Sequence, residues 1–136
     1  MGNCFEVLAV ILLSVILVSV LGAQATFYLI HEKRISTVRA SSGPTLLFAL
    51  IVSLLPITFI TTLQAAFFGS TFVGMTDKSR MGKKRVLVSS VIFALIYSFL
   101  VPLAKGIGGG LGAAAFGSCA LIFLLAKIVR LKTKAI

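Results

Sequence analysis

The side chains best suited to acid–base chemistry stand together at one place in this sequence, at His31 and Glu32. An imidazole beside a carboxylate can exchange a proton with a substrate when both groups reach the same atom. Neighbouring residues on a helix point in different directions, so this pair predicts a polar cap at a helix end instead. The two cysteines, Cys4 and Cys119, stand at opposite ends of the chain and indicate neither a disulfide framework nor a metal site. We therefore expect no catalytic residue, no metal site and no bound cofactor.

A run of small residues late in the chain is suited to close packing of helices. A glycine-rich phosphate loop would need a following Lys-Ser or Lys-Thr pair, which this run lacks. Small residues recur instead at intervals of four, at Gly108, Gly109, Gly112, Ala113 and Gly117. Such spacing lets two helix backbones approach each other closely. It predicts packing against a partner subunit or inside the chain's own helical bundle, and the sequence leaves both open.

Two threonines form a second candidate packing face. Thr58 and Thr61 share one face at helical spacing, just after Pro56, in an otherwise apolar stretch. Pro56 removes a backbone hydrogen bond and predicts a kink in the helix. Polar side chains gain more from a neighbouring helix than from lipid tails. We expect Thr58 and Thr61 to face another helix.

The composition indicates that the chain is surrounded by lipid. Hydrophobic residues make up 59% of the 136 residues and charged residues only 12%, about half the usual fraction of a soluble domain. A chain this apolar cannot cover a water-facing surface, whereas a lipid bilayer suits it. The net charge of +10 is also typical of nucleic-acid binding, but the basic residues lie between the apolar runs and follow no single face. We expect a lipid bilayer as the surroundings and no nucleic-acid partner.

Four long stretches without charged residues predict the fold. We expect an all-α, polytopic membrane protein with four transmembrane helices in a single membrane domain, 1–136. The helices are expected over about 7–30, 45–69, 86–104 and 106–126, each close to the ~20 residues that cross a hydrocarbon core of about 30 Å. Ala23-Gln24-Ala25 resembles a signal-peptidase site. The absence of a basic segment before it favours a retained first helix, with cleavage as the alternative.

The distribution of Lys and Arg predicts the orientation. The N-terminal segment has none, while the three connections and the tail carry three, five, one and four. Four crossings would put nine basic residues on the side that holds the N-terminus, the second connection and the tail, against four on the other side. Because cytosolic segments are enriched in basic residues, we expect both termini in the cytosol. Lys33, Arg34 and Arg39 of the first connection oppose this assignment.

Two lysines of the tail resemble an address signal. Lys132 and Lys134 have the spacing of the dilysine retrieval signal of endoplasmic-reticulum membrane proteins. A signal of this kind is read by vesicle-coat proteins and does not anchor the chain. We expect an endoplasmic-reticulum membrane protein, with a plain basic anchor as the alternative interpretation of the tail. Near the other terminus, Cys4 is a candidate either for palmitoylation or for a free thiol.

The layout resembles the keratinocyte-associated protein 2 family, small accessory subunits of the oligosaccharyltransferase. The resemblance rests on Gly43 through Phe48 before the second apolar stretch, on Phe67-Phe68-Gly69 at its end, and on the lysine-rich tail. It implies several membrane helices, other membrane subunits as partners, and no catalytic residues. The apolar stretches also lack the buried charge that pumps and ion-coupled transporters use. We therefore expect a non-catalytic accessory subunit or assembly factor of a multisubunit endoplasmic-reticulum membrane complex, with the oligosaccharyltransferase as a candidate.

Two other functions remain open on the sequence. Arg39-Ala40 resembles the start of the Arg-Ala-x-x-Asn-x-x-Glu signature of the microsomal glutathione transferase and leukotriene synthase family. In this chain Gly43 and Leu46 stand where that family has Asn and Glu. A membrane-embedded, glutathione-transferase-like enzyme is one alternative. The other is an accessory subunit of a mitochondrial inner-membrane complex, in which case the two lysines are not a signal.

Overall fold

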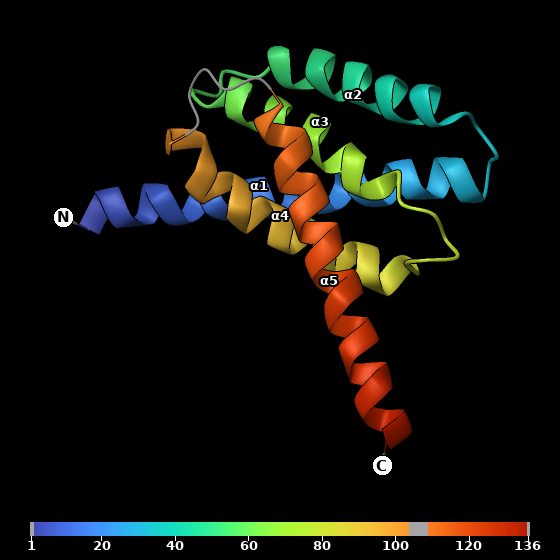
Figure 1. Ribbon diagram of the computed structural model, residues 1–136. Coiled ribbons are helices and arrows are strands. Elements are labelled where there is room, and N and C mark those ends of the chain that lie inside the picture. The colour runs from blue at the N-terminus through green and yellow to red at the C-terminus, as the bar shows by residue number, and fades with distance from the viewer. Residues whose placement is uncertain (1, 104–108, 136) are drawn as a thin grey trace.

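The described part of the chain is entirely helical. A computed structural model describes residues 2–103 and 109–135, and over these residues it contains five helices and no strand (Figure 1). They are α1 (Gly2–His31), α2 (Thr37–Ser53), α3 (Ile60–Gly74), α4 (Lys83–Leu103) and α5 (Gly110–Ala135). The all-α prediction is confirmed. Helices α1, α2 and α4 begin earlier than the hydropathy of the sequence indicates, and α5 begins later and extends further into the tail.

The expectation of one kinked helix over 45–69 is wrong. The chain leaves the helix after Ser53 and re-enters it at Ile60, so α2 and α3 are separate. Pro56 has no N–H to donate, and its ring disfavours the helical conformation for Leu55 before it. Short-range hydrogen bonds close the turn instead, from the Leu54 N–H to the Ile51 carbonyl and from the Ile57 N–H to the Leu55 carbonyl. The proline therefore reverses the chain where we expected it only to bend.

Helices α2 and α3 form an antiparallel hairpin around this turn. The hydroxyls of Ser41 and Thr71 share a buried hydrogen bond of 2.8 Å at the end of the hairpin far from the turn. The rings of Phe48 and Phe67 stack at 4.3 Å in its middle. Nearer the turn, Gln64 Nε2 donates to the Ala49 carbonyl at 3.2 Å and to Ser53 Oγ at 3.1 Å. Polar contacts between helices thus hold both ends of the hairpin.

The five helices alternate in direction. Contacts of Gly22 with Ser70 and of Thr26 with Gly74 show that α1 and α3 are parallel. The hydrogen bond of 3.2 Å from Gln24 Nε2 to the Lys83 carbonyl brings the late part of α1 to the start of α4. Helix α5 runs in the same sense as α3 but crosses the bundle obliquely, and its C-terminal end extends away from the other helices (Figure 1).

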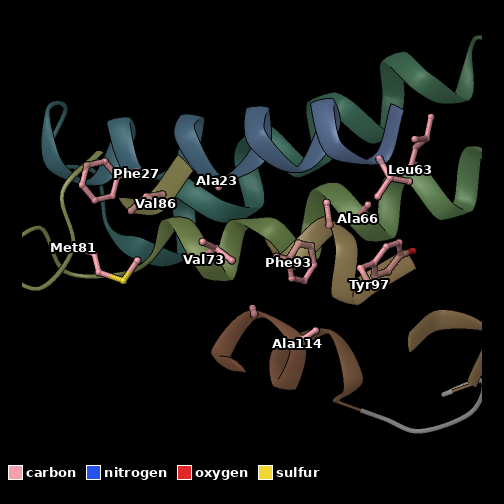
Figure 2. Packing of buried hydrophobic residues seen from close by; sticks show 13 residues of the cluster. Ala23, Phe27, Leu63, Ala66, Val73, Met81, Val86, Phe93, Tyr97 and Ala114 are labelled. Carbon is pink, nitrogen blue, oxygen red and sulfur yellow. The ribbon is translucent and has the colours of Figure 1, made fainter. Parts of the chain in front are cut away.

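The hydrophobic core lies where α1, α3 and α4 meet, with α2 on one side and α5 on another (Figure 2). Phe27 of α1 and Phe93 of α4 are the largest fully buried side chains. Val73 of α3 lies between them along the core, and Ala114 brings α5 against it (Figure 2). Many of the remaining buried positions are small. The buried polar residues of the described chain are all Ser or Thr: Ser19, Thr26, Ser41, Ser70, Thr71, Ser89, Ser90 and Ser118.

Two glycines let α1 and α3 approach each other more closely than any side chain would allow. A Cβ on Gly22 would collide with Ser70 Oγ and lie 2.9 Å from the Phe67 carbonyl oxygen. A Cβ on Gly74 would collide with the Ala23 carbonyl oxygen and lie 2.9 Å from Thr26 Cβ. Backbone-to-backbone packing of this kind is typical of helices that associate in lipid, where small residues replace large apolar ones at the contact.

Candidate functional site

The residues of α5 that we predicted to pack, Gly112, Ala113 and Gly117, do not lie in its contact with the bundle. Among the described residues, no atom beyond the chain neighbours and the helix's own backbone lies within 4 Å of a Cβ placed on Gly109, Gly112 or Gly117. Ala113 and Gly117 are exposed, and Gly112 is half-buried. Gly108 lies outside the described residues. The contact of α5 with the rest of the described chain uses other residues, Ala114, Ala115 and Ser118, all of them buried. We call Gly112, Ala113 and Gly117 the outer face of α5.

The glycines that make the close contacts, Gly22 and Gly74, were not predicted from the sequence, although a signal for them was present. Ala66, Ser70 and Gly74 repeat small residues at intervals of four along α3, as the residues of α5 do. The Gly22–Ala23 pair of α1 lies opposite this repeat. The same pattern therefore occurs on two helices, and only the tertiary structure distinguishes the buried copy from the exposed one.

A shallow groove beside the outer face separates α5 from α3. It has a volume of about 250 Å³ and is lined by Phe72, Met75, Thr76, Gly112, Ala115, Phe116 and Cys119. Phe116 is 76% exposed and forms a ridge next to Gly112. Cys119 is a half-buried free thiol whose sulfur lies 3.5 Å from Thr76 Oγ1. A glycine beside an exposed aromatic ring leaves room for the ridge of another helix.

Thr58 and Thr61 are not buried against another helix of the described chain. Thr58 lies in the turn between α2 and α3, and Thr61 is the second residue of α3; both are exposed. The neighbouring residue Thr62 does contact another helix, through its backbone: its carbonyl oxygen accepts a hydrogen bond of 3.0 Å from the Tyr97 hydroxyl of α4. Because the chain turns at Pro56, Thr58 does not share a helical face with Thr61.

His31 and Glu32 make separate contacts at the end of α1. His31 Nε2 lies 3.2 Å from the Thr76 carbonyl oxygen, and its ring packs on Phe27 at 4.3 Å. Glu32 Oε1 lies 3.2 Å from Lys83 Nζ and 4.0 Å from Lys78 Nζ. The hydrogen bond and charge of Lys83, with the charge of Lys78, hold the pKa of Glu32 below its ordinary value. The histidine thus ties α1 to the end of α3, and the glutamate ties it to the start of α4.

These contacts bring two basic connections to the same end of the bundle. We call this the basic end; its cations are Lys33, Arg34, Arg39, Lys78, Arg80, Lys83, Lys84 and Arg85. The described residues at the opposite end, where α1 begins and α2 turns into α3, contain no Lys or Arg. Because 45–69 turns back on itself, the cations of the first connection no longer oppose those of the second.

The lysines of the tail lie apart from the bundle. Lys132 and Lys134 are exposed in the last turn of α5, which extends beyond the other helices (Figure 1). Two further cations of the same helix, Lys127 and Arg130, lie nearer the bundle. Cys4 is exposed in the first turn of α1, at the opposite end.

Two of the described helices have the length and composition of a membrane crossing, α1 and α5. Their most apolar 18-residue windows have mean hydropathies of 2.8 and 2.0, and only 17% of each window is buried. The apolar core helix of a soluble protein would instead be mostly covered. Exposed large apolar side chains also occur on the other helices, as at Leu50, Phe68 and Leu95.

No protein-family model, no curated protein and no solved structure matches this chain.

Proposed function

We propose that this protein is a non-catalytic subunit or assembly factor of a multisubunit complex in the endoplasmic-reticulum membrane. The observation that carries the proposal is the outer face of α5, where Gly112, Ala113 and Gly117 have open space beside them and no role in the bundle. The partner that fits this face is a transmembrane helix of another subunit. Two helices in lipid associate through such small-residue faces because their backbones can approach closely.

The chemistry of the described residues supports a binding role. The eight buried polar side chains of the described chain are hydroxyls of Ser and Thr, and four of them donate to carbonyls of their own helix. The segment Arg39-Ala40, which resembles the glutathione-transferase signature, begins α2 with Ala40 buried. Gly43 stands there without a neighbouring atom within 4 Å, in place of the Asn of that family.

The first helix is retained in the mature protein. Ala23, the first residue of the segment that resembles a signal-peptidase site, is fully buried between helices. Phe27 and Val15 of the same helix belong to the hydrophobic core. Cleavage after Ala25 would remove the element around which α3 and α4 pack, and this packing supports retention.

The N-terminus and the tail lie on opposite sides of the membrane. Helices α1, α4 and α5 each cross once, while α2 and α3 enter and return as a hairpin. At 1.5 Å per residue α2 and α3 are only about 26 and 23 Å long, so the hairpin returns to the side it started from whether or not its turn reaches the far surface. The basic end and the tail then share the cytosolic side, in keeping with the enrichment of Lys and Arg there. This replaces the expectation of two cytosolic termini, which assumed four crossings.

Residence in the endoplasmic reticulum is proposed from Lys132 and Lys134, which are exposed on α5 and lie on the proposed cytosolic side. Replacing both by serine should move a tagged protein onward to the Golgi or beyond, as seen by fluorescence microscopy. Unchanged residence in the endoplasmic reticulum would show that partners retain it. Location in mitochondria would support the inner-membrane alternative.

The docking face is tested by extraction in a mild detergent, affinity purification and mass spectrometry. Wild-type protein should copurify with stoichiometric membrane partners, and the resemblance to the keratinocyte-associated protein 2 family makes oligosaccharyltransferase subunits the first to look for. Gly112→Leu should lose the partner while the protein stays folded, because nothing lies within 4 Å of the new Cβ. Gly43→Leu, on α2 with equal open space, is the matched control and should keep it. A lone wild-type particle, or equal loss in both variants, would refute the proposed docking face.

A further inference from the structure

We propose that the groove between α4 and α5 binds one anionic glycerophospholipid. The cations of the groove would bind the lipid phosphate, and its apolar floor would pack against an acyl chain. The groove has a volume of about 410 Å³. Its cations are Lys84, Arg85 and Arg130. Its apolar lining consists of Val88, Ile122, Leu125, Ala126 and Val129. The inference rests on the membrane location proposed above and is independent of the partner at the outer face of α5.

The two kinds of lining are arranged along the groove as a lipid requires. Helices α4 and α5 are antiparallel here, so Lys84 and Arg85 of the first turn of α4 lie near Arg130, late in α5. Val88 is one turn deeper along α4, and Ile122 lies about 12 Å from Arg130 along α5 at 1.5 Å per residue. The cations therefore mark the end of the groove at the membrane surface, and the apolar residues continue toward the hydrocarbon core.

The cations of the groove have no carboxylate partner in the described chain. The chain has only three acidic residues in all. Glu32 pairs with Lys78 and Lys83, and Asp77 accepts hydrogen bonds from the Ser79 hydroxyl and N–H. The two ion pairs between described residues leave out Lys84, Arg85 and Arg130. They are therefore available to an anion from outside the chain.

The position of Lys84 and Arg85 strengthens this requirement. Both lie in the first turn of α4, which carries no acidic residue. The N-terminus of a helix carries a partial positive charge, so cations are unfavourable there and an anion is favourable. A phosphate at this point would interact with the cations and with the helix end together.

A phospholipid fits these features better than an acidic peptide or a nucleic acid. A peptide or nucleic acid would leave the apolar lining of Val88, Leu125 and Val129 without a matching surface. Anionic lipids gather at the cytosolic leaflet, where the basic end is proposed to lie, and they bring an acyl chain of the right character. The groove opens to the surface, so a lipid could enter it sideways from the leaflet.

The test is native mass spectrometry of the full-length protein in mild detergent, with dioleoyl phosphatidylserine or dioleoyl phosphatidylcholine added. One phosphatidylserine should bind in preference to phosphatidylcholine. Arg85→Gln with Arg130→Gln should weaken that binding by about 25-fold, at about fivefold for each basic residue removed. Lys33→Gln with Arg34→Gln removes the same charge elsewhere on the basic end and should change it by less than twofold. Equal losses in the two double variants would overturn the groove in favour of diffuse attraction by the whole basic end.

A second variant tests the acyl chain without changing the charge. Ala126 is half-buried in the floor of the groove, so Ala126→Phe should fill the floor and displace the lipid. Soluble glycerophosphoserine, which has no acyl chains, should compete only weakly with phosphatidylserine. Strong competition by it, or unchanged binding to Ala126→Phe, would show a plain anion site and overturn the lipid assignment. Preference for an acidic peptide over phosphatidylserine would overturn it as well.

Failure of this inference and failure of the proposed function give different results. Loss of partner proteins in Gly112→Leu should leave phosphatidylserine binding unchanged, because Gly112 does not line the groove. Equal binding of phosphatidylserine and phosphatidylcholine to a protein that keeps its partners would overturn the lipid site alone. Far-UV circular dichroism of each variant establishes that it has folded.

Discussion

Replacing Gly74 by alanine should force α1 and α3 apart and destabilise the fold. The added Cβ would collide with the Ala23 carbonyl oxygen, which belongs to the backbone of α1 and cannot rotate away. It would also lie 2.9 Å from Thr26 Cβ, where ordinary contact begins at 3.4 Å. The helices must therefore separate by at least about half an ångström, a gap that already forfeits about a quarter of the dispersion energy of each contact they lose.

The expected size of the effect follows from two opposing contributions. Overpacking at a tight contact typically costs about 1–3 kcal/mol. Alanine gains up to about 1 kcal/mol over glycine inside a helix, but less here, because Gly74 is the last residue of α3. The net loss of stability should be about 2 kcal/mol. Gly117→Ala is the matched control, because it lies within α5 with no atom within 4 Å of its Cβ, and it should gain up to about 1 kcal/mol.

The assay is unfolding of the purified protein by a titration of SDS into mild-detergent micelles. The chain has no tryptophan, so the transition is followed by far-UV circular dichroism. The midpoint for Gly74→Ala should fall below that of the wild type, and the midpoint for Gly117→Ala should equal or exceed it. Two variants that shift in the same direction by the same amount would refute the close approach of α1 and α3.

Three further predictions concern topology, pH and a buried hydroxyl. In a variant with Cys119 replaced by serine, Cys4 should react with a membrane-impermeant maleimide from one side of the membrane, and a cysteine placed at Thr133 should react from the other. Labelling of both cysteines from the same side would contradict an odd number of crossings. Lysine partners lower the pKa of Glu32 in the fold, so its contribution to stability is present above the ordinary glutamate pKa and is lost as the pH falls through the lowered value. Glu32→Gln should therefore weaken the dependence of the unfolding midpoint on pH in the acidic range, and an unchanged dependence would show that the ion pairs do not contribute. Ser19 Oγ is buried without a hydrogen-bond partner in the described chain, so Ser19→Ala should stabilise the fold by about 1 kcal/mol in the same SDS titration; a loss of stability would indicate a bound water or an unrecognised partner.

Helix content followed from the sequence, but the path of the chain did not. Long apolar stretches predict helices because each residue adds its own hydropathy, and this held for α1, α4 and α5. The error at Pro56 arose because a proline in an apolar stretch is compatible with a kink or with a reversal. The contacts that decide between them, Ser41 with Thr71 and Gln64 with Ala49, join residues far apart in the sequence.

The candidate packing residues show the same division. The repeat at Gly112, Ala113 and Gly117 and the repeat at Ala66, Ser70 and Gly74 look alike in sequence. One lies in open space and the other meets the backbone of α1, because burial depends on which helix faces which. The groove beside Arg130 could not be found from sequence either, since its two walls are about 40 residues apart along the chain.

Composition and charge by themselves determined that this chain is apolar and basic, since these properties are sums over residues and do not depend on the fold. The length of its uncharged stretches predicted helices. The tertiary structure alone decided that the basic connections meet at one end, that Gly22 and Gly74 let α1 and α3 approach closely, and that the outer face of α5 lies away from the bundle. The physical reason is that each of these depends on the reversal of the chain at 54–59. A single turn in the middle of an apolar stretch changes the direction of every helix after it, and no local sequence pattern records that change.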